Sequence, residues 1–165
     1  MSSKRNPPNE LGVPFVDVVV EIPKWSFVKY GSTGSVDFVS PLPCPVNYGS
    51  VPDYIGLEGD LLDAVVLGPR LQRGTRLRVP AWGAVTLADR GLFDDKLICS
   101  PEPVTAAQRA AVLRFFHVYA RCKALLNLSR GRRGRNACDG WLEARQALNR
   151  ARPRGKAWRG SPVDF

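Results

Sequence analysis

Residues 58–67 read EGDLLDAVVL, an acidic turn that leads directly into an apolar run. Gly59, between the first two carboxylates, favours a tight turn, and the run at 64–67 is typical of a buried β-strand. Clustered carboxylates repel one another and resist desolvation unless a cation or a proton lies among them. Hard oxygen ligands at this density suit Mg²⁺, which binds few protein carboxylates and keeps positions for water and phosphate oxygens. For these three acids taken alone, a solvent-exposed turn is the better interpretation.

A second acidic segment shifts the interpretation towards a site. Residues 89–96, DRGLFDDK, lie between two predicted strands, so their carboxylates also fall at a strand connection. If both segments belong to one β-barrel, Asp89 and Asp94 can converge with the first group on a set of divalent cations. Lys29 and Lys96 would then meet the phosphate oxygens that the metals leave free. The two segments together predict a metal-dependent phosphate site.

The composition is that of a globular domain. With 165 residues, 44% hydrophobic and 24% charged, the chain is long enough for one domain with a real core. It has no apolar run of the roughly 20 residues that span a bilayer, and residues 1–8 lack the apolar core of a secretory signal. The four cysteines are scattered and His117 is the single histidine, a pattern that disfavours a zinc site. We expect free thiols and a cytoplasmic protein.

The net charge of +9 is concentrated at one end of the chain. Residues 1–120 hold 12 basic and 12 acidic side chains, whereas residues 121–165 hold 12 basic and 3 acidic ones. The segments 130–135, RGRRGR, and 150–156, RARPRGK, carry most of this excess. Such a segment attracts polyanions, including nucleic acid or polyphosphate. Solvated surface arginines explain it nearly as well, and both interpretations stay open.

The periodicity of the chain changes from strands to helices near residue 105. Short apolar runs punctuated by Gly and Pro predict strands, whereas residues 105–126 and 140–150 carry helical spacing. Many strands followed by helices predict an α+β, mainly β fold, a small β-barrel with helices packed on its outside. We expect a flexible N-terminal arm at 1–13, a single domain at 14–150 and a basic, flexible tail at 151–165. The predicted strands are 16–22, 36–39, 64–67, 75–79, 83–87 and 96–99.

Five stretches, in order along the chain, resemble the soluble family I inorganic pyrophosphatases. They are VVEIP at 19–23 with Lys29-Tyr30, PVNYG at 45–49, the loop at 58–63, residues 88–96 and FFHVY at 115–119. The family pattern of the central loop is Asp-Gly-Asp-Pro-x-Asp, from which Glu58 and Leu61 depart. The resemblance implies an OB-like five-stranded β-barrel with C-terminal helices packed outside. It also implies Mg²⁺-dependent hydrolysis of inorganic diphosphate to two orthophosphates.

The same resemblance implies a role for individual residues. Asp60 would be the base that deprotonates the attacking water. The metal ligands would be the five carboxylates Glu58, Asp63, Asp89, Asp94 and Glu21. The groups contacting the phosphates would be Lys29, Tyr48, Lys96 and Tyr119. Several Mg²⁺ ions are implied as cofactors, with Mn²⁺ as the other ion that suits these ligands, and a homo-oligomer is implied as the assembly.

Departures from the family pattern fall mainly on the phosphate-binding groups. Residues 36–44 contain no arginine where the family has one, Cys44 replaces a tyrosine and Ala120 replaces a lysine. Arg121 and Lys123 are the nearby cations that could substitute for the last of these. The sequence therefore predicts a diphosphatase with a weakened grip on phosphate. The alternative is an impaired or retuned homologue that binds polyanions or nucleic acid through its arginine-rich C-terminal segment.

Overall fold

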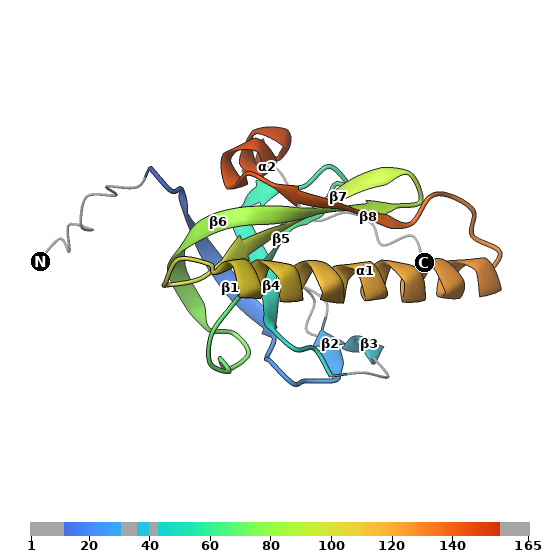
Figure 1. The fold of residues 1–165 in the computed structure, drawn as a ribbon, viewed down its shortest axis with the longest axis horizontal. Coiled ribbons are helices and arrows are strands. Elements are labelled where there is room, and N and C mark those ends of the chain that lie inside the picture. The colour runs from blue at the N-terminus through green and yellow to red at the C-terminus, as the bar shows by residue number, and fades with distance from the viewer. Residues whose placement is uncertain (1–11, 31–35, 40–42, 156–165) are drawn as a thin grey trace, which may run out of the picture.

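The computed structural model describes residues 12–30, 36–39 and 43–155 (Figure 1). The helices are α1 (Ala106–Ser129) and α2 (Ala144–Arg150). The strands are β1 (Phe15–Ile22), β2 (Val28–Tyr30), β3 (Val36–Val39), β4 (Asn47–Ile55), β5 (Leu61–Val66), β6 (Arg76–Asp89), β7 (Leu92–Cys99), β8 (Ala137–Leu142) and β9 (Arg152–Pro153).

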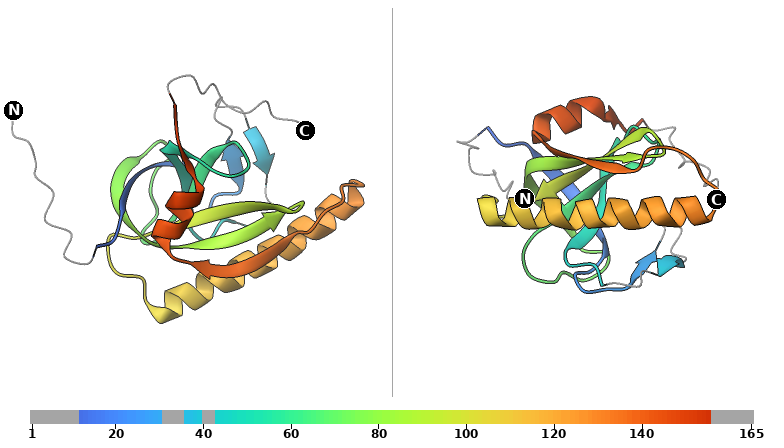
Figure 2. Two further views of the ribbon diagram at one scale, coloured as in Figure 1. Left: turned by 90° about the horizontal axis from the view of Figure 1, so that it is seen from above. Right: turned by 45° about the vertical axis from the view of Figure 1, so that its right-hand side comes forward.

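Five of these strands close into a ring. They pair in the order β1-β4-β5-β7-β6, and a further pairing of β1 with β6 completes the circuit. The β5–β7 pair is parallel and the other pairs of the ring are antiparallel. Strand β8 adds to β6, the short β9 adds to β4, and β2 and β3 form a separate hairpin. Both helices lie outside the ring (Figure 2), so the predicted OB-like, mainly β architecture is confirmed.

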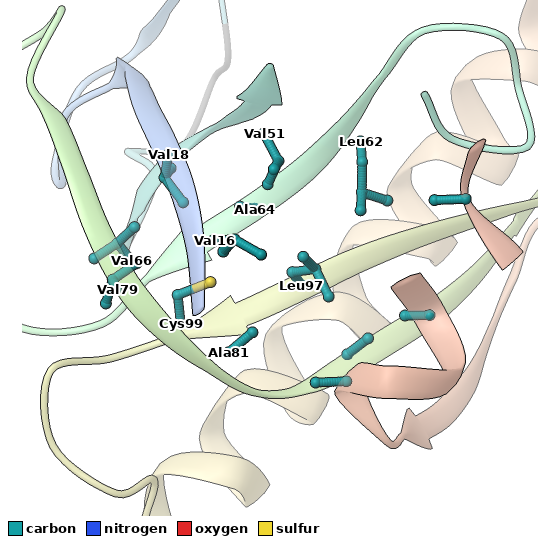
Figure 3. Close-up of a cluster of buried hydrophobic side chains, with 14 residues drawn as sticks. Val16, Val18, Val51, Leu62, Ala64, Val66, Val79, Ala81, Leu97 and Cys99 are labelled. Carbon is teal, nitrogen blue, oxygen red and sulfur yellow. The ribbon is translucent and has the colours of Figure 1, made fainter. Parts of the chain in front are cut away.

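The interior of the ring is filled by small and branched apolar side chains (Figure 3). Strand β1 alternates buried and exposed residues, so Val16 and Val18 point inwards. Leu62 and Ala64 of β5 and Leu97 of β7 do the same, and α2 packs on this cluster through Ala144 and Ala147. Each fully buried valine or leucine contributes about 1.5–3 kcal/mol of transfer free energy. The inward set fixes which residues of the same strands face outwards.

Helix α1 covers part of the outer face. Thr105 caps it, accepting a hydrogen bond from the backbone N–H of Gln108 while the Gln108 side chain accepts one from the Thr105 backbone. Val112 and Phe116 of the helix pack on Val65, Val85 and Ile98 of the ring, with Leu87 beside them. A second apolar cluster therefore lies under the first half of α1 and borders the polar part of the same face.

One long strand was not predicted, and two other predictions were wrong in detail. Residues 47–55 form the long strand β4, which the sequence did not predict because Gly49 and Pro52 are residue types uncommon inside strands. The predicted strands 75–79 and 83–87 are parts of one strand, β6, with a register shift at the bend. The second helix begins at Ala144 instead of residue 140, because residues 137–142 are strand β8.

Other predictions concern features at the chain ends and the cysteines. All four cysteines are free, as expected, in the described part of the chain. No helix among the described residues has both the length and the apolarity to cross a membrane. Residues 152–153, assigned to the tail by sequence, pair with Tyr54 and Ile55 of β4. Residues 1–11 of the predicted arm and 156–165 of the predicted tail lie outside the described residues, so the domain boundaries stay a prediction.

Gly49 provides a test of the β1–β4 contact. A Cβ added there would lie 2.0 Å from the Val19 carbonyl oxygen and 2.8 Å from the Val19 carbonyl carbon, and both are backbone atoms that cannot rotate away. We expect Gly49→Ala to lower the free energy of unfolding in urea by about 3 kcal/mol. Gly155→Ala, where no heavy atom lies within 4 Å, is the matched control. Equal midpoints for the two variants would contradict the close approach.

Candidate active site

A row of polar residues crosses the outer face of the ring. Ser50 of β4 pairs with Asp63 of β5, and Asp63 pairs with Lys96 of β7. Since side chains alternate along a strand, Asp94 lies on the same face as Lys96. Leu62 and Leu97, next to these residues in sequence, point into the interior core. The candidate site is therefore built on the backs of core strands.

Lys96 is the centre of this row. Its Nζ atom contacts Asp63 Oδ2 and lies 2.6 Å from both carboxylate oxygens of Asp94. The side chains of Lys96 and Asp94 are only 6% and 7% exposed. Burial disfavours the ammonium ion, but Asp63 and Asp94 hold the pKa of Lys96 well above its usual range. Lys96 is therefore a cation at neutral pH.

Three carboxyl groups crowd one point beside that lysine. One oxygen each from Glu58, Asp63 and Asp94 lie within 4.8 Å of one another. Desolvation, followed by a hydrogen bond to Asp94 and its negative charge, raises the pKa of Glu58 to about 9. Burial opposes ionisation of Asp94, yet the charge of Lys96 and hydrogen bonds from Glu58 and Lys96 hold the Asp94 pKa below its usual value. Glu58 therefore carries a proton, which it shares with Asp94 in a hydrogen bond. The three carboxyl groups form an oxygen donor set that fits a divalent cation in place of that proton.

The turn that carries Glu58 is set by glycine. The Gly56 N–H donates to the Asp60 carbonyl at 2.7 Å and the Gly59 N–H donates to the Gly56 carbonyl at 3.1 Å. Gly59 has φ +93°, a value that side chains with a Cβ rarely adopt. The turn directs Glu58 towards Asp94, while Asp60 is exposed and lies outside the group of three carboxylates.

Tyr48 of β4 lies next to Lys96 of the cluster. The Lys96 ammonium lies 5.8 Å from its ring centroid. Burial, and then the negative charge of Asp63, raises the pKa of Tyr48 well above its ordinary value. The phenol therefore keeps its proton and can donate a hydrogen bond to an anionic ligand.

Asp89 ends β6 and pairs with a residue of the long helix. Lys123 Nζ lies 2.5 Å from Asp89 Oδ2, and the Asp89 side chain is 14% exposed. Asp89 Oδ1 is buried without a hydrogen-bond partner in the described part of the structure, with Arg90 Nε 3.9 Å away. Asp89 is not one of the three clustered carboxylates. Lys123 nevertheless contributes to the lowered pKa of Asp94, after the larger effects of burial, Lys96 and Glu58, so its charge acts on the cluster.

The remaining predicted site residues border the cluster or have side chains outside the described part of the structure. Tyr119 contributes to the raised pKa of Tyr48, after the larger effects of burial, Asp63, Lys96 and Asp94, so it lies near that residue. Glu21 accepts a 2.8 Å hydrogen bond from the Ser50 hydroxyl and so is linked to the residue opposite Asp63. Tyr119 of α1 is 40% exposed and packs against Phe115 and Phe116. Lys29 lies in β2, and its side chain falls outside the described part of the structure.

Of two further polar residues of this face, Ser50 was not predicted, and Lys123 was named only as a possible substitute for the lysine missing at position 120. Ser50 is buried between Glu21 and the Asp63 position, which only the strand register reveals. Lys123 follows Tyr119 by four residues, a spacing that puts both on one face of a helix and could have pointed to it.

These observations define a closed β-ring with a carboxylate–lysine cluster on its outer face. The family model described as inorganic pyrophosphatase matches residues 18–123, well over half of the chain. The chain therefore belongs to the inorganic pyrophosphatase family, as the sequence resemblance implied. The matched segment contains every predicted site residue from Glu21 to Tyr119.

Individual relatives agree with this assignment. The chain is 35% identical over 94 residues to an inorganic pyrophosphatase of Gluconobacter oxydans, covering 52% of this chain and 54% of the relative. It is 33% identical over 123 residues to that of Streptomyces coelicolor, covering 62% and 76%. A soluble inorganic pyrophosphatase of Oryza sativa subsp. indica is 40% identical over 103 residues, covering 56% and 48%. The chain thus spans about half the length of the first and third of these relatives.

Solved structures support the fold. The inorganic pyrophosphatase of Coxiella burnetii superposes with a TM-score of 0.67 at 25% identity, covering 84% of this chain and 92% of that one. The enzyme of Thermus thermophilus gives a TM-score of 0.67 at 24% identity, covering 89% and 92%. The overall fold is therefore shared with these proteins.

The buried lysine generates a stability prediction. Lys96→Met leaves the Asp63 and Asp94 charges without their counter-ion, so we expect the free energy of unfolding to fall by about 3–5 kcal/mol in chelator-treated protein. Lys24→Met is the matched control, because the Lys24 side chain makes an exposed contact with the Gly68 carbonyl and lies over Trp25, away from any carboxylate cluster of the described residues. Urea unfolding of both variants measures the difference. Similar small losses in the two variants would show that Lys96 does not neutralise the cluster.

The raised pKa of Glu58 predicts a pH-dependent affinity for divalent cations. Below a pKa of about 9 the group holds its proton, and a metal ion must displace it, so affinity rises with pH by up to roughly tenfold per unit. Calorimetric Mg²⁺ titrations of chelator-treated protein between about pH 6 and 8 measure this slope. Glu58→Gln removes the proton and should flatten it. An equal slope in both proteins would rule out Glu58 as its source.

Proposed function

We propose that this protein hydrolyses inorganic diphosphate to two orthophosphates in a Mg²⁺-dependent reaction. The observation that carries the proposal is the convergence of Asp63 and Asp94, from two neighbouring strands, with Glu58 around one buried lysine. Membership of the inorganic pyrophosphatase family supports it. A cluster of acids and a lysine is suited to a substrate that is itself a polyanion, because metal ions and ammonium groups together balance its charge.

The carboxylates would hold the metal ions. Glu58, Asp63 and Asp94 form the central donor set, and Asp89 and Glu21 are proposed as further ligands on either side of it. When bound, Mg²⁺ supplies a lowered pKa for an attacking water and neutralises phosphate charge. Mn²⁺ is the other ion that oxygen ligands of this kind admit.

The protein's own side chains would supply the proton transfer and the phosphate contacts. Asp60 lies two residues from Glu58 in the same exposed turn, where a carboxylate is accessible to water and can accept its proton. Lys96 and the protonated phenol of Tyr48 would bind phosphate oxygens from the ring side. Lys29 and Tyr119 are proposed to contact the phosphates as well, on the strength of the sequence resemblance.

We propose that the grip on phosphate is weaker than the family pattern provides. Cys44 stands where that pattern has a tyrosine; its thiol donates to the Val46 carbonyl, and burial raises its pKa. A neutral, engaged thiol cannot replace a phenol as a phosphate ligand. Each missing charge-assisted contact lowers affinity or rate by about 1.5–3 kcal/mol, which corresponds to roughly tenfold to a hundredfold.

We propose a homo-oligomeric, cytoplasmic protein. Several apolar side chains of α1 are strongly exposed, among them Val118, Leu125 and Leu128. Exposed apolar surface of this kind is commonly covered by a partner, and a second copy of the chain is the partner that the family resemblance implies. The free cysteines suit a reducing compartment.

Release of orthophosphate from diphosphate tests the proposal. With Mg²⁺ present we expect turnover, and Asp60→Asn should lower kcat by about 100- to 10,000-fold because the amide cannot accept the proton of the attacking water. Asp53→Asn makes the same chemical change in β4, at an exposed residue outside the cluster, and should leave turnover unchanged.

The outcome that would overturn the proposal is equally concrete. It is the absence of turnover with any phosphoanhydride in Mg²⁺ or Mn²⁺, combined with salt-sensitive RNA binding that alanine at Arg130, Arg132 and Arg133 abolishes while the fold is kept. That result would favour the polyanion-binding alternative.

A further inference from the structure

We propose that Lys123 is a substrate-binding residue that stays paired with Asp89 until a divalent cation binds the Asp89 carboxylate. This inference rests on the proposed function and extends it to a residue of α1. Lys123 would compete with the cation for Asp89 in the free protein and bind a phosphate oxygen once the cation is in place.

The first observation is the ion pair itself. Lys123 Nζ lies 2.5 Å from Asp89 Oδ2, and the two side chains are 31% and 14% exposed, so the pair sits at the rim of the cluster and not in open solvent. One Asp89 oxygen is engaged by the ammonium, while the other is buried without a hydrogen-bond partner in the described part of the structure. A carboxylate in this condition offers a site for a second, more highly charged cation.

The second observation is that α1 and the β6–β7 turn are held together by contacts other than the Lys123–Asp89 ion pair. Asn136 Oδ1 accepts hydrogen bonds from the side chain of Asn127 in α1 at 3.2 Å and from the Arg90 N–H at 3.4 Å. The Gly91 N–H also donates to the Arg135 carbonyl at 3.0 Å. The β6–β7 turn and the end of α1 are thus joined through the loop that precedes β8. Lys123 would still face Asp89 if the ion pair opened.

The third observation is the reach of the side chain. A lysine has a flexible four-carbon stem, so its ammonium can turn from one oxygen to another without movement of the helix. Lys123 already acts on Asp94 electrostatically and follows Tyr119 by one helical turn. It is therefore placed to bind an anion over the cluster when Asp89 no longer holds it.

The proposal predicts effects of opposite sign on two affinities. Lys123→Met removes a cation that competes for Asp89, so Mg²⁺ should bind chelator-treated protein more tightly, by about threefold to tenfold. The same change removes a phosphate contact, so inorganic phosphate should bind the Mg²⁺-saturated protein roughly tenfold more weakly. A residue that only stabilised the fold would weaken both.

The experiment measures Mg²⁺ and inorganic phosphate binding by calorimetry, with wild-type diphosphate hydrolysis assayed in parallel. Lys123→Arg keeps the charge and the pairing with Asp89, and should behave like the wild type. Arg114→Met removes the same charge from an exposed position earlier in α1 and should change neither affinity.

The two proposals fail in distinguishable ways. A wild-type protein that hydrolyses diphosphate while Lys123→Met shows unchanged affinities, or affinities that weaken together, overturns the role of Lys123 alone. A wild-type protein that neither binds Mg²⁺ nor hydrolyses diphosphate overturns the proposed function and this inference with it.

Discussion

The structure depends on the repulsion between Asp63 and Asp94 being cancelled by one buried ammonium group. These carboxylates come from β5 and β7, the parallel pair of the ring, and Lys96 lies directly opposite Asp63 in that pair. A slip of one residue in this register would turn Asp63 into the apolar interior and expose Leu62 instead. The closure of the ring between β1 and β6 restricts such a slip. Correct pairing of the barrel and assembly of the cluster are therefore one requirement.

Local sequence signals were enough for much of the fold and for part of the site. Apolar runs bounded by Pro or Gly located β1 and β3, and the two acidic segments pointed to Glu58, Asp63 and Asp94. Asp63 and Asp94 lie within β5 and β7, however, and not in the connections predicted from the sequence. Elements with mixed signals were missed: β4 contains Gly49 and Pro52, and β8 is short with Gly140 inside it. Ser50 could not be assigned from local patterns, because its place follows from strand register. Lys123 was named from the sequence as a candidate cation, but its pairing with Asp89 follows only from the structure.

Stability and chemistry share the same strands. On β5 and β7 the inward residues Leu62, Ala64 and Leu97 belong to the apolar core. The outward residues divide between the cluster and the apolar contacts of α1. Side chains on well-paired strands are held more firmly than side chains on loops. Glu58 and Asp60 instead lie in an exposed turn. The candidate site therefore combines side chains fixed by strand pairing with side chains carried by a loop.

The short strand β9 has a consequence for the behaviour of the chain in solution. Arg152 and Pro153 lie against the end of β4, and the Arg154 N–H donates to the Asp53 carbonyl at 2.8 Å. The C-terminal segment thereby covers backbone groups at the end of β4 that would otherwise be open to strands of neighbouring molecules. Proline has no N–H to offer an incoming strand, and the flanking arginines repel like copies. The first residues of the arginine-rich C-terminal segment therefore protect the end of β4 from pairing with other copies of the chain.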